Sequence, residues 1–323
     1  MRSRQSAVRA SALVALALIA ATAAAQTYPN RPIRVIVPLP AGGAIDSVVR
    51  GMAQKLTEGI GQNVIVDNRP GAGGIIGMET AMNASADGYT VVAIGATQLT
   101  YPLLYKARYD LLRDFEPVSQ MTAQGYVATV HASLAARSVA ELVQHLLANP
   151  GKLNFASSGV GGPIHLTGEL FMAATGTRMT HVPYKGMAIA YTDMLSGNVE
   201  VGFPTLVSAS PHLRANRLRA LAVTAPQRVP AYSEIPTMAE AGVKGVVVTN
   251  WYGIVAPAGT PRAAAEKLSR EIVAAIRHPD VAKRLAGDGS EAVGSTPDAF
   301  RSHIGAEREK WAKVIRDRGI RAQ

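Results

Sequence analysis

The 323-residue chain contains no cysteine. This absence excludes disulfide bonds, thiolate metal sites and a thiol nucleophile. With 48% hydrophobic and 17% charged residues, the chain is long enough to form one or two globular domains with a substantial core. That core has to supply the stability that disulfides would otherwise give in an oxidising compartment.

Apolar runs long enough to span a bilayer are also missing after residue 25. At the N-terminus, three arginines precede the short apolar run Leu13–Ala20, and Ala23–Ala25 provides small residues for cleavage. This pattern predicts a Sec-type signal peptide over residues 1–25, cleaved after Ala25. The mature protein is therefore expected to be soluble and periplasmic. The cleavage site lacks the cysteine of a lipoprotein anchor.

No run of one charge sign stands out. Removing the three arginines of the signal peptide from the formal net charge of +10 leaves +7, spread as single charges. A basic stretch interleaved with aromatic residues is absent, so no nucleic-acid partner is expected. A modest positive field that attracts small anions fits better, although solubility alone also explains it.

Common catalytic and cofactor motifs are missing as well. The sequence has no HExxH, no phosphate loop, no GxGxxG, no GxSxG and no Asp/Glu/His cluster at metal-ligand spacing. We therefore expect no metal and no cofactor. Ser157 and His165, together with an aspartate, could still be drawn as a hydrolase site. A serine in a glycine loop is more simply a hydroxyl donor.

What the sequence does contain is a strand, a glycine loop and a helix near its start. The β-branched run Ile33–Pro38 predicts a buried strand, Pro40-Ala41-Gly42-Gly43 ends it, and Asp46 stands in the first turn of a helix. Backbone N–H groups at a helix N-terminus form a site for an anion such as a carboxylate. The alternative is a tight turn that needs glycine only for its backbone angles.

The next segments continue as helix, strand, helix and strand, which implies a parallel sheet covered by helices. The sequence also predicts a short helix or turn over Asp110–Pro117 and a helix over Ser138–Ala148 that Ser138 caps, with Glu141 three residues on. Further helices are expected over Ile75–Met82, Pro236–Ala241, Arg262–Arg277 and Pro297–Asp317.

The strand Thr90–Ile94 is expected to end in a loop, Gly95–Gln98. Because open α/β sheets bind ligands at the carboxyl ends of their strands, Thr97 and Gln98 are candidate contacts. Ordinary turn polarity explains them equally well.

A second strand, glycine loop and helix occur in the middle of the chain. The strand Leu153–Ala156 leads into the loop 157–163 (SSGVGGP), and a helix is expected from Ile164 to Ala174. His165 lies in its first turn, where a structural hydrogen bond is the simpler interpretation. Two such loops that face each other would form a cleft that holds an anion from both sides.

Several longer motifs together carry a family resemblance. They are YPNRPIRVIVPLPAGGAID, DNRPGAGGIIG, YDLLRDFEPV, FASSGVGGPIHLTGELF, HVPYKG, IPTMAEAG and WYGIVAPAGTP. Through them the chain resembles the Bug receptors, the extracytoplasmic solute-binding proteins of tripartite tricarboxylate transporters, over nearly all of its mature length.

The resemblance implies an α/β, two-lobed periplasmic-binding-protein fold of the Venus flytrap, type II-like kind. Each lobe would be a mixed sheet flanked by helices. Lobe one would comprise residues 26–125 and 226–323, and lobe two residues 126–225. Two crossings, near Ala123–Tyr126 and Val223–Arg228, would form the hinge. The protein would be a monomer without enzymatic activity, with a small organic carboxylate and the integral-membrane transporter subunits as its partners.

The resemblance also implies which residues hold the ligand. Backbone amides, hydroxyls and water would do so, without an arginine clamp. Ala41, Gly42 and Gly43 would hold one carboxylate while Asp46 orders their loop, and Thr97 and Gln98 would contact the distal part. Asp193 would shape the far wall or be a structural helix carboxylate. The complete implied set is Pro40, Ala41, Gly42, Gly43, Asp46, Thr97, Gln98, Ser157, Ser158, Gly162, His165, Tyr184, Lys185, Asp193 and Thr205.

Four departures from the family pattern limit what carries over. They are Leu39, Ala44-Ile45, Thr97-Gln98-Leu99 and Glu200. The first three line or adjoin the expected pocket, so the class of ligand carries over better than its identity. A di- or tricarboxylate, an acidic amino acid or an aromatic acid would all fit. The alternatives are a periplasmic hydrolase that uses Ser157 and His165, or a solute sensor for a signalling partner.

Overall fold

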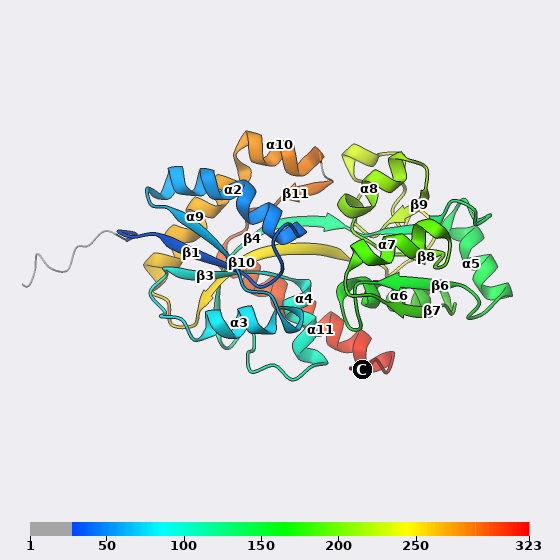
Figure 1. Cartoon of the computed structure of the whole chain (residues 1–323), viewed down its shortest axis with the longest axis horizontal. Coiled ribbons are helices and arrows are strands. Elements are labelled where there is room, and N and C mark those ends of the chain that lie inside the picture. Colours follow the sequence, from blue (N-terminus) through cyan, green and yellow to red (C-terminus); the bar gives the residue numbers. More distant parts are fainter. Residues whose placement is uncertain (1–27, 288, 323) are drawn as a thin grey trace, which may run out of the picture.

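The computed structural model describes residues 28–287 and 289–322, so the predicted signal peptide lies outside the described residues. The described chain forms two sheets with helices on their faces, joined by long strands through the middle of the molecule (Figure 1). Both sheets mix parallel and antiparallel pairs. The predicted α/β architecture of two mixed sheets is therefore confirmed.

The larger sheet has six strands in the order β11-β4-β10-β3-β1-β2. Its three parallel strands come from the start of the chain, and β10 and β11 bring in the C-terminal part by antiparallel pairing. Their bounds are β1 Ile33–Val37, β2 Val64–Asn68, β3 Thr90–Gly95, β4 Phe115–Gly125, β10 Thr249–Pro257 and β11 Ser290–Ala292.

Helices cover the larger sheet on both faces. On one face, α2 (Ala44–Ile60), α9 (Arg262–Arg277) and α10 (Pro279–Gly287) bury their apolar sides against one set of strand residues. On the other face, α3 (Ile75–Met82), α4 (Ala96–Thr100) and α11 (Pro297–Asp317) pack on the alternate set. This alternation is what a sheet buried on both faces requires.

The smaller sheet has five strands in the order β7-β6-β8-β5-β9. Its strands are β5 Val127–His131, β6 Asn154–Ser157, β7 Thr180–Pro183, β8 Val201–Gly202 and β9 Leu218–Val223. Its helices are α5 Val139–Ala148, α6 Pro163–Thr175, α7 Met187–Ser196 and α8 Leu206–Arg214. The expected N-cap of α5 is confirmed, because Ser138 Oγ accepts the Glu141 N–H at 3.2 Å.

The chain passes from the larger to the smaller sheet between Gly125 and Val127, and it rejoins the larger sheet at Thr249. Before that return, Tyr232 and Ile235 pack with Leu206 and Val223 of the smaller sheet's side. The lobe boundaries remain a proposal. These contacts favour placing the segment that precedes β10 with lobe two, so that lobe one resumes at about Thr249 instead of residue 226.

Three local expectations need correction, and one helix was missed. The expected loop Gly95–Gln98 is largely the helix α4, and the expected helix or turn at residues 110–117 gives way to strand from Phe115. The helix expected at Pro236–Ala241 is a turn, and α8 was not expected. Three short 3₁₀ turns complete the described fold: η1 (Ala72–Gly74), η2 (Tyr101–Leu103) and η3 (Pro230–Tyr232).

Candidate ligand-binding site

The loop between β1 and α2 is open to solvent. Pro40, Ala41, Gly42 and Gly43 are all exposed, and no side chain caps the N-terminus of α2. Figure 1 shows the first turn of α2 in the middle of the molecule, between the two sheets. The N–H groups of a first helical turn have no intrahelical partner, so Ala44 and Ile45 present theirs at the positive end of the helix dipole.

Asp46 orders this loop, as the resemblance implied. Its buried carboxylate accepts the Gly42 N–H at 2.8 Å, the Arg50 Nε at 3.0 Å and the Asn68 Nδ2 at 3.0 Å. Burial alone would raise the pKa of Asp46, but these hydrogen bonds outweigh it and lower that pKa. The carboxylate is therefore ionised over the physiological range.

These hydrogen bonds of Asp46, called the Asp46 clamp below, correct the expected role of Gly42. The N–H of Gly42 is already bound to Asp46 and is not available to a ligand in this arrangement. Gly42 has φ +80° with open space beside it, so its role is to turn the chain. Binding by the remaining amides of the loop stays a prediction.

Gln98 also departs from its expected role. Its side chain is 1% exposed, Oε1 accepts the Gly95 N–H at 2.9 Å, and its backbone carbonyl accepts the Tyr109 hydroxyl at 2.8 Å. It fixes the start of α4 and does not face solvent. Thr97 beside it is partly exposed and remains the candidate contact on this strand end.

The corresponding loop of the smaller sheet is ordered without charge. Ser157 is fully buried at the end of β6. Its hydroxyl accepts the Gly159 N–H at 3.1 Å, lies 3.1 Å from the Gly159 carbonyl, and is 2.6 Å from His181 Nε2. Burial, with a smaller effect from His165, lowers the pKa of His181 to about 3, so this imidazole is neutral.

The structure contradicts the proposed Ser157–His165 catalytic pair. The Nδ1 of His165 accepts the Gly161 N–H at 3.0 Å, and the serine bonds to His181 instead. The two imidazoles stack with centroids 3.8 Å apart. His165 is 5% exposed, so it is a structural residue that holds the loop through the Gly161 N–H. Sequence reasoning missed His181, although it stands in the HVPYKG motif.

The remaining expected residues divide into structural and available groups. The Tyr184 hydroxyl donates to Asp193 Oδ2 at 2.7 Å, which supports the structural interpretation of Asp193. Burial and this carboxylate raise the pKa of Tyr184 to about 12. Thr205 caps α8. Lys185 is exposed and makes no ion pair within the described residues, while Ser158 and Gly162 lie in the loop itself.

Residues of η2 and the two residues that follow it, which the sequence did not single out, bring the two lobes into contact. The Tyr105 hydroxyl donates to the Val160 carbonyl at 3.2 Å. A Cβ at Gly161 would lie 2.1 Å from Leu104 Cδ1, and one at Gly159 would lie 3.5 Å from the Tyr101 hydroxyl. The only sequence signal was the cluster of tyrosines that follows α4.

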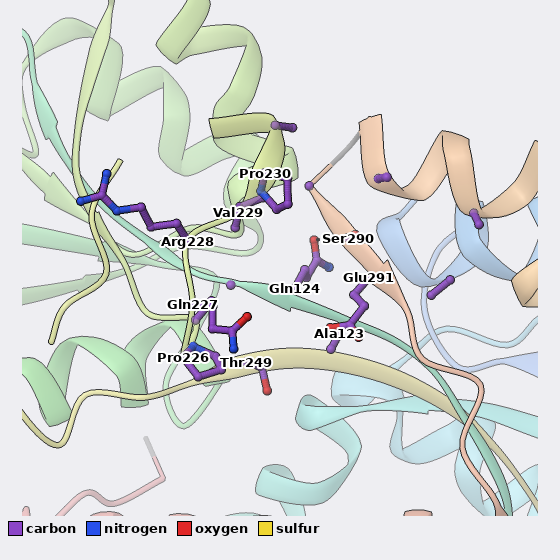
Figure 2. A pocket seen from close by; sticks show the side chains of 17 residues that line it. Ala123, Gln124, Pro226, Gln227, Arg228, Val229, Pro230, Thr249, Ser290 and Glu291 are labelled. Carbon is purple, nitrogen blue, oxygen red and sulfur yellow. Dashed lines mark hydrogen bonds between the residues drawn. The ribbon is translucent and has the colours of Figure 1, made fainter. Parts of the chain in front are cut away.

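A cavity of about 790 Å³ lies elsewhere, between the strand β4, the segment 225–231, α10 and β11 (Figure 2). None of the fifteen expected site residues lines it. Its cation Arg228 is paired with Glu240 at 2.9 Å, and Glu291 in the wall would repel a carboxylate. We therefore place the candidate site at the two helix-terminal loops.

The described residues contain neither a membrane-spanning helix nor a cluster of metal ligands. Across residues 28–287 and 289–322, no helix is long and apolar enough to cross a membrane. In the same part of the chain, no group of three or more histidine or acidic side chains could hold a metal ion.

Two sheets are joined by long connecting strands, and each sheet has a glycine loop followed by an uncapped helix N-terminus. This arrangement defines a two-lobed solute-binding protein. The chain belongs to the tripartite tricarboxylate transporter receptor family, whose model matches residues 48–320. This is a family of receptors, so the expectation of a receptor instead of an enzyme is confirmed.

Individual relatives agree with this assignment. The chain is 36% identical over 311 residues to the protein BugT of Bordetella pertussis, which covers 95% of each chain. A structure of R. palustris Rpa4515 with adipate superposes with a TM-score of 0.83 at 34% identity, covering 91% of this chain and 99% of that one. MatC from Rhodopseudomonas palustris with bound malate gives 0.79 at 27% identity, covering 89% and 100%.

Proposed function

We propose that the protein captures a small dicarboxylate between its lobes and delivers it to a tripartite transporter in the membrane. The observation that carries this proposal is the pair of uncapped helix N-termini, of α2 and α6, each preceded by an ordered glycine loop. Each can hold one carboxylate by its dipole and first-turn N–H groups.

The chemistry of the two termini supports a doubly anionic ligand. In α2 the first-turn N–H groups belong to Ala44 and Ile45. In α6, Pro163 has no N–H, so Ile164 and His165 present theirs. The exposed Lys185 adds a mobile positive charge on the side of lobe two. Thr97 and Ser158 are left to contact the middle of the ligand.

Two structural relatives carry ligands of this class, adipate in one and malate in the other. Both are dicarboxylates of four to six carbons, and the two proteins share the fold of this chain over most of its length. The departures at Leu39 and Ala44-Ile45 lie beside the α2 terminus, so we expect them to select the length and substitution of the ligand.

The family assignment supports a membrane transporter as the partner that receives the solute. Together with the signal peptide expected over residues 1–25, it supports a periplasmic location. We further propose that the receptor acts as a monomer and binds no nucleic acid.

The test is a thermal-shift panel on protein that has been unfolded and refolded to remove any co-purified ligand. It would contain adipate, malate, succinate, citrate, glutamate, nicotinate and, as a neutral control, glucose. A ligand at 100 times its dissociation constant adds about 2.7 kcal/mol, which is a shift of several degrees. Shifts confined to dicarboxylates support the proposal. Shifts with glucose alone contradict it. Turnover of a bound compound would favour the alternative interpretation of the protein as an enzyme.

A further inference from the structure

The C-terminal helix α11 belongs to the larger sheet, but the residue that follows it reaches across to the smaller one. Arg318 Nε donates to Glu169 Oε2 of α6 at 2.9 Å. Glu169 has 14% of its side chain exposed and Arg318 34%, so the pair is more shielded than an ordinary surface ion pair. In Figure 1 the end of α11 lies beside the lobe that contains α6.

At its other end, α11 is fixed to a hinge strand. Trp251 of β10 packs edge-on against Phe300 with ring centroids 5.6 Å apart, and its Nε1 donates to Glu307 at 3.4 Å. The same carboxylate accepts the Trp311 Nε1 at 2.9 Å. Both tryptophans are fully buried. A movement of β10 at the hinge would therefore displace α11 and Arg318 with it.

From Glu169 the contacts continue to the loop that precedes α6. Glu169 Oε1 lies 3.6 Å from His165 Nε2, and His165 Nδ1 accepts the Gly161 N–H at 3.0 Å. Because Nδ1 is an acceptor, the neutral imidazole carries its proton on Nε2, directed toward Glu169. One carboxylate thus uses its two oxygens to join the C-terminal helix to the glycine loop.

We propose that Arg318 and Glu169 are positioning residues that couple the angle between the lobes to the shape of the loop 159–162. The proposal rests on the receptor function argued above. The ion pair is formed when the lobes are as close as they are here. Opening would separate Arg318 from Glu169 and free His165 to release the Gly161 amide. Closing would set that loop in the arrangement described here.

A second contact on the same loop strengthens this assignment. The Val160 carbonyl accepts the hydroxyl of Tyr105, which lies two residues beyond η2. The larger sheet's side of the molecule therefore contacts residue 160 directly and reaches residue 161 through Glu169 and His165. Glu169 shares its carboxylate between Arg318 and the histidine that orders a candidate ligand loop. Loss of the pair should therefore change both lobe geometry and loop order.

The absence of cysteine makes the lobe angle directly measurable. Ala140→Cys on α5 and Ala274→Cys on α9 place dyes at two exposed positions in different lobes for single-molecule energy transfer. We expect Arg318→Gln and Glu169→Gln each to widen the interlobe distance distribution without ligand. We expect the double variant to match the single ones, because both remove the same contact.

The matched control is Arg316→Gln, which removes an exposed arginine of α11 whose ion pair, within the described residues, is with Asp317 of the same helix. It should leave the distribution unchanged. Exchange of the Gly161 amide, followed by NMR, should accelerate in Glu169→Gln and Arg318→Gln but not in the control. Malate or adipate, whichever raises the melting temperature of the wild type in the thermal-shift panel, should bind three- to tenfold more weakly to Glu169→Gln and Arg318→Gln.

Unaltered distance distributions and unaltered Gly161 exchange in both folded variants would overturn the proposal, as would equal changes in Arg316→Gln. Circular dichroism verifies that each variant folds. The distance and exchange measurements use no ligand, so they judge the coupling even if no carboxylate binds. A panel without any carboxylate shift would contradict only the proposed function.

Discussion

The two candidate loops solve the same problem by different chemistry. In the larger sheet, the loop 40–43 is exposed and is ordered by the ionised Asp46, which binds Gly42, Arg50 and Asn68. In the smaller sheet, the loop after Ser157 is ordered by neutral groups. The buried Ser157 hydroxyl accepts the Gly159 N–H, His165 accepts the Gly161 N–H, and His181 bonds to the serine.

The difference shows two ways in which a protein can present amides to an anion without a negative charge that repels it. Asp46 is negative, but Arg50 balances it and its oxygens are occupied by donors. The amides of the second loop are held by a hydroxyl and an imidazole instead of a carboxylate, and Glu169 of α6 lies behind His165, 3.6 Å from its Nε2. We therefore expect the first loop to respond to charge removal and the second to steric change and pH.

The largest effect should come from Gly161→Ala. Gly161 has φ +73°, and an added Cβ would lie 2.1 Å from Leu104 Cδ1 of the other lobe. Backbone strain and overpacking together should cost about 3 kcal/mol in the free energy of unfolding. Chemical denaturation measures that loss, and the carboxylate thermal shift should be abolished.

The matched control is Gly176→Ala, because Gly176 has a similar φ of +67° but open space where the Cβ would lie. Backbone strain alone should lower its free energy of unfolding by about 1 kcal/mol, and ligand binding should be unchanged. Equal effects of the two substitutions would show that contact between Leu104 and the second loop is unimportant.

Asp46→Asn should have the next largest effect. The substitution turns one acceptor oxygen into an NH₂ group that faces the donors of Gly42, Arg50 and Asn68. Loss of charge-assisted hydrogen bonds should cost about 2 kcal/mol and weaken carboxylate binding about tenfold. Asp280→Asn, which changes an exposed first-turn carboxylate of α10, should do neither. Binding of normal strength by a folded Asp46→Asn protein would contradict the clamp.

These cases show what sequence could and could not predict. Residue periodicity and turn chemistry located most elements, and the helices 75–82, 262–277 and 297–317 agree with the structure at both ends. The strand β4 was partly missed because its sequence, FEPVSQMTAQG, is polar along much of its length. Pairing with β10 on one side and β11 on the other buries it, and such long-range pairing has no local signal.

The candidate site was predicted at the level of loops, not of side chains. Spacing placed Ser157 and His165 near each other, but only the pairing of β6 with β7 brings His181 to the serine. Gln98 looked like a ligand contact because the polar residue follows a strand, yet its side chain turns inward to cap α4. Contacts between lobes, such as Arg318 with Glu169, join residues 149 positions apart and could not be read from spacing.

The neutral order of the second loop predicts a pH effect at higher pH than that of the first loop, because Asp46 has a lowered pKa and loses its stabilising contribution only in more acidic solution. His181 has a folded pKa of about 3 against an ordinary value of 6.5, so the unfolded chain takes up the proton first as pH falls. Its contribution to stability is complete above pH 6.5 and is lost as the pH drops toward 3. The slope is at most about 1.4 kcal/mol per pH unit, and partial exposure of the ring reduces it.

His181→Gln, which keeps a donor for Ser157, should flatten the unfolding free energy between pH 6.5 and 4.5 relative to the wild type. Denaturation at several pH values measures this difference. A surface substitution, His278→Gln, should retain the wild-type slope. Parallel curves for wild type and His181→Gln would refute the neutral, buried state of this imidazole.

Lys185 offers the smallest but most selective change. It is exposed beside Tyr184 and makes no ion pair within the described residues, so Lys185→Gln should leave the free energy of unfolding unchanged. If its charge attracts the ligand, affinity should fall about two- to fivefold at low salt, and the difference should shrink at high salt because ions screen exposed charges. Lys152→Gln, at the opposite end of β6, is the control. Calorimetric titrations at two salt concentrations separate the cases. An equal, salt-independent loss of affinity in both variants would mean that the amides alone hold the anion. The contrast between a charged first loop and a neutral second loop would then extend to the ligand contacts themselves.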